Sequence, residues 1–289
     1  MLKIIQGIMQ FTGRLSPKLS AKIAMHMSSR PRRYPDSERE KSQLAQARKI
    51  TYRGALGTEN TAWSWGEGPV VILCHGWEAK ATKMATLAMA IAERGFQAVA
   101  IDATAHGHSE GKVCNFDIMA KDICSLAQQF PEIFAIVGHS MGGMMTMRAR
   151  EFGLKARCYS ILGAPSAPLP IIEIMKKMLK VSTETTEICQ DKIAKQIGFS
   201  WQELLQCKMY TPEDTPLLMI YDMEDDEVPI FHGERIHKTW PAAEMIKISG
   251  VGHRKMVWDT DVIKSVVGFL NQEKSRENTI ETDLSKLVS

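Results

Sequence analysis

The sequence predicts an α/β fold with a mostly parallel sheet and helices on both of its faces. Short apolar runs alternate with helix-like stretches along most of the chain, and parallel strands need such a crossover between one strand and the next. With 289 residues and 44% hydrophobic content, the chain is long enough to cover both faces of the sheet as one domain. Ligands of open α/β sheets gather at the carboxyl ends of the strands, so reactive side chains are expected at those positions.

The expected core elements follow one another in β–α order. A hairpin over 50–53 and 61–65 opens the core, and the apolar run Val70–Cys74 is the first strand that both faces of a sheet would bury. The other strands are expected at 97–101, 133–137, 157–162, 216–221 and 244–248, and the helices at 81–94, 116–129, 144–152 and 259–270.

The alternation breaks between about residues 165 and 207. Three prolines within Ala164–Pro170 lead into a helical region that is rich in Ile, Met and Leu. We interpret this region as a small helical cap inserted into a core domain of residues 50–271. Residues 1–49 are expected to form an N-terminal helical extension, and residues 272–289 a loose polar tail.

The N-terminal segment Met1–Met27 has apolar side chains at a helical spacing (Ile4, Ile8, Phe11, Leu15 and Leu19) with Lys and Arg around them. Two interpretations stay open: the helix packs on the core, or it makes a weak contact with an acidic lipid surface. The segment does not match a secretory signal peptide or the length of a transmembrane helix. Six scattered cysteines without a C-x-x-C pair favour a reducing compartment, so we expect a cytoplasmic protein.

Ser140 stands in the pentapeptide Gly138-His139-Ser140-Met141-Gly142, between an expected strand and an expected helix. A sharp turn at this place exposes the hydroxyl at the sheet edge and aims a helix N-terminus at it. Acidic residues follow the expected strand that ends at Tyr221, and His253 follows the strand that ends at Ile248. A serine becomes a nucleophile when a base takes its proton and an acid orients that base, so this order of residues indicates a Ser–acid–His triad.

Five segments make the chain resemble the α/β-hydrolase superfamily, and within it the small bacterial serine hydrolases of esterase type. They are His75–Glu78, Asp102–Ser109, Gly138–Gly143, Asp222–Pro229 and Gly250–Arg254. The resemblance covers about residues 50–271. It implies Ser140 as nucleophile, His253 as base and Asp225 as the orienting acid. Asp222 and Asp226 stay open as alternatives for the acid.

The same resemblance implies an oxyanion hole made by the backbone N–H groups of Trp77 and Met141. We expect the indole of Trp77 to crowd the pocket near the carbonyl carbon. The substrate-binding side chains are expected to be Trp77, His139, Met175 and Met178. His75 and His106 are expected to bind loop backbone rather than act as bases.

These residues predict a hydrolase that cleaves an ester-type acyl bond of a small molecule through an acyl-enzyme. A peptidase or amidase, a thioesterase, and a non-catalytic binding protein on the same fold stay open as alternatives. No H-E-x-x-H motif and no cysteine pair at zinc spacing is present, so neither metal nor cofactor is expected. The net charge of +3 is small, so no nucleic-acid partner is expected, and the chain is expected to be a monomer or homodimer.

Overall fold

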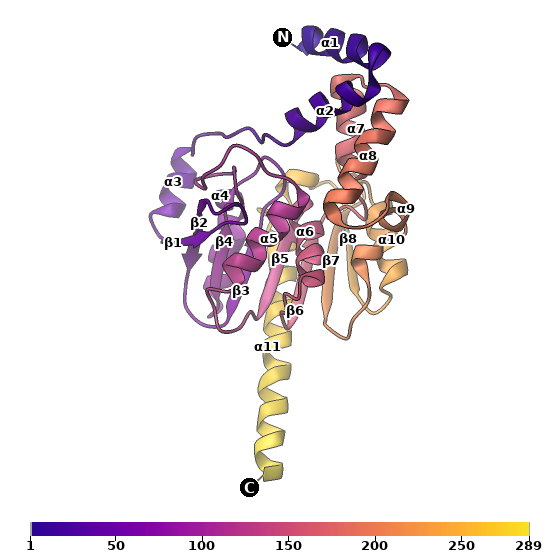
Figure 1. Ribbon diagram of the computed structural model, residues 1–289. Coiled ribbons are helices and arrows are strands. Elements are labelled where there is room, and N and C mark those ends of the chain that lie inside the picture. Colours follow the sequence, from indigo (N-terminus) through magenta and orange to yellow (C-terminus); the bar gives the residue numbers. More distant parts are fainter. Residues whose placement is uncertain (1, 289) are drawn as a thin grey trace.

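The computed structural model describes the backbone of residues 2–288 and the side chains of residues 2–276. Within this range the chain forms one eight-stranded sheet in the order β1-β2-β4-β3-β5-β6-β7-β8 (Figure 1). β1 pairs antiparallel with β2, β2 pairs antiparallel with β4, and the other neighbours are parallel. The predicted fold class is confirmed. The strands are β1 (Arg48–Arg53), β2 (Glu59–Trp65), β3 (Val70–Cys74), β4 (Gln97–Ile101), β5 (Ala135–His139), β6 (Cys158–Leu162), β7 (Leu217–Asp222) and β8 (Glu244–Ile248).

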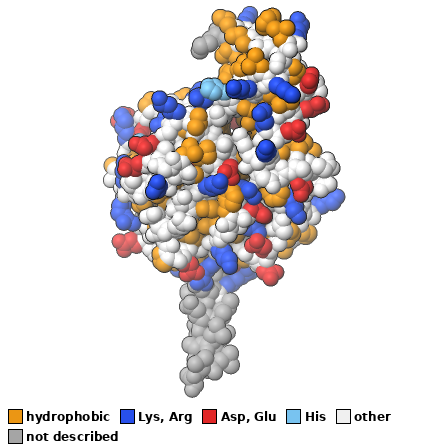
Figure 2. All heavy atoms as spheres, in the orientation of Figure 1, with side chains coloured by type: hydrophobic (Ala, Val, Ile, Leu, Met, Phe, Trp, Pro, Cys, Tyr) orange, Lys and Arg blue, Asp and Glu red, His pale blue; other side chains and the backbone are white. Residues whose placement is uncertain are grey.

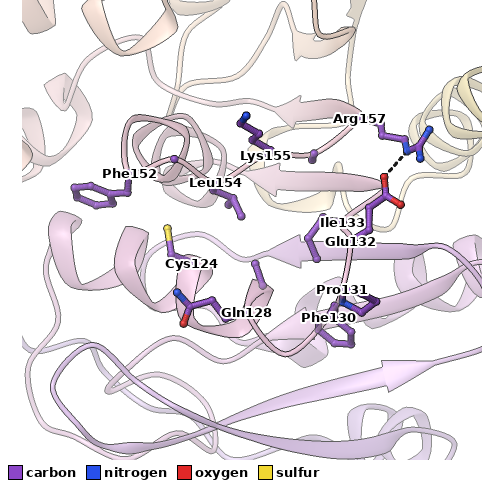
Figure 3. Close-up of a pocket in the computed structure, with 13 residues that line it drawn as sticks. Cys124, Gln128, Phe130, Pro131, Glu132, Ile133, Phe152, Leu154, Lys155 and Arg157 are labelled. Carbon is purple, nitrogen blue, oxygen red and sulfur yellow. Dashed lines mark hydrogen bonds and ion pairs between the residues drawn. The ribbon is translucent and has the colours of Figure 1, made fainter.

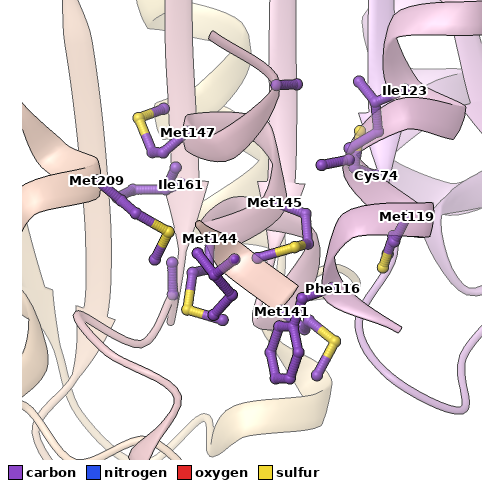
Figure 4. Packing of buried hydrophobic residues seen from close by; sticks show 14 of the residues in the cluster. Cys74, Phe116, Met119, Ile123, Met141, Met144, Met145, Met147, Ile161 and Met209 are labelled. Carbon is purple, nitrogen blue, oxygen red and sulfur yellow. The ribbon is translucent and has the colours of Figure 1, made fainter. Parts of the chain in front are cut away.

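Helices cover both faces of the sheet, which explains why its central strands are apolar throughout. Alternate side chains of β3 point to opposite faces: Val71 and Leu73 join one core cluster, and Ile72 and Cys74 join the other. The first cluster lies under α4 (Ala81–Ala92) and α11 (Thr260–Val288). The second lies under α5 (Phe116–Ala127) and α6 (Met141–Glu151), where methionines of α6 fill the space between the sheet and α5 (Figure 4).

A helical lobe stands over the sheet edge at which β5 runs into α6 (Figure 1). The insertion between β6 and β7 supplies α7 (Leu169–Ile174), the π-helix η1 (Met175–Leu179), α8 (Thr183–Ile197), α9 (Trp201–Leu205) and the 3₁₀-helix η2 (Lys208–Tyr210). The N-terminal helices α1 (Leu2–Leu15) and α2 (Pro17–Ser28) complete the lobe, because α1 packs on α2 and η1, and α2 packs on α8. The remaining helices are α3 (Glu38–Leu44), α10 (Phe231–Thr239) and the 3₁₀-helix η3 (His253–Lys255).

Two helix predictions need correction. The single N-terminal stripe is divided into two helices at Ser16, whose hydroxyl caps α2 by accepting from the Leu19 N–H, with Pro17 in the first turn. The last helix does not end at Leu270 but continues to Val288, so the expected loose tail is helical up to that residue. No proline follows Leu270, and Lys274 Nζ donates to the Gly95 carbonyl at 3.1 Å, so nothing local stops the helix. Residue 289 lies outside the described residues.

Candidate active site

Ser140 lies in the turn between β5 and α6 with φ 55° and ψ −127°, a strained conformation for a residue with a side chain. The close approach of the chain around this turn requires its glycines. A Cβ on Gly138 would lie 2.4 Å from Gly143 Cα, and one on Gly142 would lie 2.3 Å from the Cys74 carbonyl oxygen. The turn therefore presents the serine at the carboxyl end of β5, directly ahead of the α6 N-terminus.

His253 connects Ser140 to a buried carboxylate. His253 Nε2 lies 2.9 Å from Ser140 Oγ, and His253 Nδ1 lies 2.7 Å from Asp225 Oδ2. Both contacts are satisfied when Nδ1 carries the ring proton and the serine hydroxyl donates to Nε2. The second oxygen of Asp225 accepts from the Glu227 and Val228 N–H groups, each at 2.8 Å, which fixes the carboxylate toward the histidine.

The two other acids of this loop do not contact His253. Asp222 is fully buried at the end of β7, where one oxygen accepts from the Glu224 N–H and the other from the Val251 and Gly252 N–H groups. Burial acts to raise the pKa of Asp222, but these backbone donors outweigh it and hold the pKa below its usual value. Asp226 is exposed. Asp222 thus holds the loop that carries His253, while Asp225 holds its ring.

Two backbone N–H groups, those of Trp77 and Met141, belong to segments that lie next to Ser140. The loop after β3 lies against the nucleophile, since a Cβ on Gly76 would be 3.0 Å from Ser140 Cβ. Met141 follows Ser140 as the first residue of α6. In the part of the chain that the structure describes, neither the Trp77 N–H nor the Met141 N–H has a hydrogen-bond acceptor. Both groups are therefore available to a ligand, as an oxyanion hole requires.

Three other histidines near the site are neutral and bind backbone. His139 Nε2 donates to the His253 carbonyl at 2.9 Å, and burial lowers the pKa of His139 to about 3. His75 Nδ1 donates to the Gly76 carbonyl at 2.7 Å, and its Nε2 accepts from the Ala103 N–H. His106 Nδ1 donates to the Thr104 carbonyl, and burial lowers the pKa of His106 to about 3. His139, which the sequence suggested for substrate binding, thus supports the backbone of the histidine loop.

A narrow pocket of about 30 Å³ lies between the core and the lobe, with room for one or two water molecules. Trp77, Met141 and Met175 line it, together with Met25 of α2 and Ile171 of α7. Trp77 also packs edge-on against His106, with ring centroids 5.0 Å apart.

Met178, which the sequence grouped with Met175, is not among the residues that line this pocket, and its side chain is 46% exposed. The two methionines lie in a π-helix, whose wider turn does not return a residue three positions on to the same face.

A second pocket, of about 440 Å³, lies far from this chemistry (Figure 3). It is formed by the end of α5 and the connections into β5 and β6, at the amino ends of those strands, with Cys124, Phe152 and Lys155 in its lining. None of the described residues that line it belongs to the Ser140 site. Ser140, His253 and Asp225 line neither pocket, and the smaller one adjoins the site through Trp77 and Met141.

Sequence reasoning missed the role of residues 30–40, which we call the N-terminal connector. Arg32 of the connector pairs with Glu78, one residue after Trp77, at 2.7 Å between Nη2 and Oε2. Lys80 is buried and pairs with Asp36 at 2.6 Å and with Glu40 at 3.4 Å. The connector thus crosses the loop that carries the Trp77 N–H. No local pattern in the sequence predicts these pairs, because the partners are at least 40 residues apart.

Within residues 2–276, no group of three or more His, Cys, Asp or Glu side chains is arranged to hold a metal ion. Among the described helices, none combines the length and the hydropathy needed to cross a bilayer.

The chain is similar to known proteins of one fold. The profile of the family described as serine aminopeptidase, S33, matches residues 68–203. A non-heme chloroperoxidase, CPO-A1 of Kitasatospora aureofaciens, is 32% identical over 92 residues, which are 30% of this chain and 33% of that protein. The chain therefore matches about a third of the length of this curated relative.

Among solved structures, the Pyrococcus furiosus esterase PF2001 superposes with a TM-score of 0.64 at 18% identity, covering 85% of this chain and 97% of that one. The bromoperoxidase of Bacillus anthracis gives a TM-score of 0.62 at 17% identity, covering 78% of this chain and 100% of that one. Est1E of Butyrivibrio proteoclasticus, solved with ferulic acid bound, gives the same values. At these identities the superpositions establish the shared fold.

Proposed function

We propose that this chain is a serine hydrolase of the α/β-hydrolase superfamily that cleaves ester-type acyl bonds. The observation that carries the proposal is the continuous hydrogen-bonded series from Ser140 Oγ through the His253 ring to Asp225 Oδ2. A non-catalytic binding protein has no need of this series. The apolar lining of the pocket beside Met141 supports an acyl substrate without a charged group near the reacting carbon.

In the proposed mechanism, Ser140 Oγ attacks the ester carbonyl carbon while His253 Nε2 takes the hydroxyl proton. The Trp77 and Met141 N–H groups stabilise the oxyanion of the tetrahedral intermediate, and Asp225 stabilises the imidazolium. The C–O bond to the alcohol then breaks, and His253 returns the proton to the leaving oxygen. Water attacks the acyl-enzyme with His253 again as base, which releases the acid and restores Ser140.

The family profile supports a second candidate, amide hydrolysis, because it is described as a serine aminopeptidase. The two candidates use the same nucleophile and differ in whether His253 protonates an alcohol or an amine. Assays of p-nitrophenyl esters from acetate to palmitate beside amino-acid p-nitroanilides separate them. Faster turnover of the anilides would replace the ester proposal.

Labelling with a fluorophosphonate probe tests the nucleophile. Wild-type protein should be labelled, and Ser140→Ala should not. In that variant kcat should fall about 10³-fold or more without loss of the fold. The residual rate is the part that the oxyanion hole and substrate binding still support. Ser166→Ala is the matched control, because Ser166 is also buried but contacts His232 instead of His253. Near wild-type turnover by Ser140→Ala would refute the mechanism.

A further inference from the structure

The apolar stripe of α1 faces away from the protein. Ile4, Ile8, Phe11 and Leu15 follow one another at intervals of four, three and four residues, so they share one face of the helix. Their side chains are 68%, 48%, 64% and 70% exposed. The opposite face, with Met9 and Gly13, is the one that the protein buries.

The exposed apolar residues extend past this stripe at both ends. Leu2 begins α1 with 45% exposure, and Leu19 lies 48% exposed in the first turn of α2. We call these residues together the α1 surface: Leu2, Ile4, Ile8, Phe11, Leu15 and Leu19. Figure 2 shows hydrophobic side chains gathered over the lobe where α1 lies in Figure 1, with Lys and Arg side chains near them. Single exposed apolar side chains are common on a protein surface, but six large ones gathered on two helices indicate an interaction site.

The charge around the α1 surface has a single sign. Lys3, Arg14, Lys18 and Lys22 are all exposed on the same two helices. The first 35 residues hold seven of the 36 Lys and Arg residues and none of the 33 Asp and Glu residues, so the first acid of the chain is Asp36. The rest of the chain therefore has an excess of acids, and the positive charge is concentrated beside the apolar stripe.

We propose that the α1 surface docks on an anionic lipid bilayer, with α1 lying in the plane of the headgroups. An amphipathic helix with an apolar stripe and flanking basic residues inserts its apolar side chains to the level of the acyl boundary, while Lys and Arg contact acidic headgroups. A symmetric contact with a second copy is disfavoured, since it would bring the Lys and Arg residues of both copies together. The Lys and Arg residues around the α1 surface, with no Asp or Glu among them, thus complement an extended anionic surface.

Docking would also bring the pocket close to the bilayer. α2 carries Leu19 of the α1 surface in its first turn and Met25 of the pocket lining near its end. The pocket beside Met141 therefore lies between the core and the docked lobe. Delivery of a lipid-borne acyl substrate to Ser140 rests on the proposed function, whereas the docking itself does not.

Co-sedimentation of the full chain with vesicles tests the docking. The protein should bind vesicles of phosphatidylcholine with about one-third phosphatidylserine, and bind pure phosphatidylcholine vesicles far more weakly. Because headgroup charges are screened by salt, binding should weaken between about 50 mM and about 500 mM NaCl. Equal binding to both vesicle types, or no binding to either, would overturn the proposal.

Paired variants assign the binding to the α1 surface. Ile8→Asp combined with Phe11→Asp should lower vesicle affinity about 100-fold or more, the loss expected when two large apolar side chains can no longer be buried. Leu56→Asp is the control, because Leu56 is 52% exposed in the turn between β1 and β2. Lys3→Gln and Arg14→Gln should each cost about fivefold, and the exposed Lys49 and Arg94 provide the matched pair Lys49→Gln and Arg94→Gln. Equal losses in the controls would contradict the assignment.

Two further measurements keep the outcomes separate. Circular dichroism of each variant verifies the fold, and sedimentation velocity of the wild type measures self-association. A wild-type dimer that Phe11→Asp converts to a monomer, without vesicle binding, would make the surface an interface between copies and overturn the proposal. Fluorophosphonate labelling without vesicle binding refutes the docking alone, and vesicle binding without labelling refutes the proposed function alone.

Discussion

Asp222 and Asp225 lie three residues apart on one loop and serve different partners. Asp225 binds the His253 ring, whereas Asp222 binds the Val251 and Gly252 N–H groups that precede this histidine. Each carboxylate is buried, so each needs its hydrogen-bond donors. Substitutions at the two positions should therefore change different properties.

Asp225→Asn should lower kcat by about 10³- to 10⁴-fold, because an amide does not hold the imidazole in the reactive tautomer or stabilise its charge. Asp222→Asn should affect mainly stability, and Asp226→Asn should leave both properties unchanged because Asp226 is exposed. Steady-state kinetics and urea unfolding of the three variants provide the comparison. If Asp222→Asn had the largest effect on kcat, the orienting acid would need to be reassigned.

Glu40 links stability to pH. Burial acts to raise its pKa, but hydrogen bonds from Ser37 and the charge of Lys83 outweigh burial and lower the pKa from 4.5 to about 2. The stabilisation from this carboxylate is complete above the unfolded value of 4.5 and is lost as the pH falls toward 2. The free energy of unfolding of Glu40→Gln should therefore depend less on pH in this window than that of the wild type.

Unfolding by urea at several pH values between 4.5 and 2 measures this difference. The control is Glu38→Gln, because the Glu38 side chain is 90% exposed. Parallel pH curves for the wild type and Glu40→Gln would contradict the assigned pKa.

At the scale of elements, the N-terminal connector joins the lobe to the loop after β3. It leaves α2, pairs through Arg32 with Glu78, and reaches Lys80 through Asp36 before α3 begins. Ion pairs with exposed partners contribute little to stability, but the Lys80 side chain is only 6% exposed and Asp36 only 13%. The Lys80 pairs are thus the ones that hold the connector in place.

Lys80→Met should destabilise the protein by about 3–5 kcal/mol, since Asp36 would lose the buried cation with which it pairs. Lys83→Met should cost less, because the Lys83 side chain is 43% exposed and pairs with Glu40 only. Midpoints and slopes of urea unfolding give both values. Equal losses of unfolding free energy in the two variants would show that the burial of Lys80 does not cause the destabilisation.

At the scale of the whole molecule, the pocket beside Met141 exists because parts of the chain that are distant in the sequence meet there. α2 supplies Met25, the loop after β3 supplies Trp77, and the cap supplies Ile171 and Met175. The cavity of about 30 Å³ is too small for a long acyl chain unless side chains move. Methionines repack at low cost, whereas the Trp77 indole is bulky and held against His106.

We therefore expect unbranched acyl groups of about two to eight carbons to be preferred over branched ones, with up to about 0.8 kcal/mol gained for each methylene until the pocket is full. Trp77→Ala should widen acceptance of branched acyl groups and keep turnover, since the backbone N–H remains. Specificity constants for a p-nitrophenyl ester panel measure this, and Trp258→Ala serves as a control at an exposed tryptophan outside the pocket. An unchanged acyl profile in Trp77→Ala would show that the indole does not limit the pocket.

The sequence by itself determined the features that depend on local patterns. Apolar runs with turns between them predicted the parallel core, and its fold class is confirmed. The glycines around Ser140 predicted the sharp turn, because a Cβ at Gly138 has no room there. The resemblance of Asp222–Pro229 to the α/β-hydrolases implied Asp225, which is the acid that lies beside His253. Such features can be recognised in the sequence, because strand ends and tight turns are specified by residues that are adjacent in the chain.

Tertiary structure decided what depends on contacts between distant segments. The stripe of α1 has the same helical spacing whether it is buried or exposed, and only the packing of Met9 and Gly13 leaves Phe11 outside. The pairing of Lys80 with Asp36 could not be predicted, because many other Asp and Glu residues could have paired with this lysine. α11 continues past Leu270, where Lys274 contacts the distant Gly95 carbonyl. A sequence pattern shows which side chains share a helix face, but the elements that pack around the helix decide whether that face is buried or exposed.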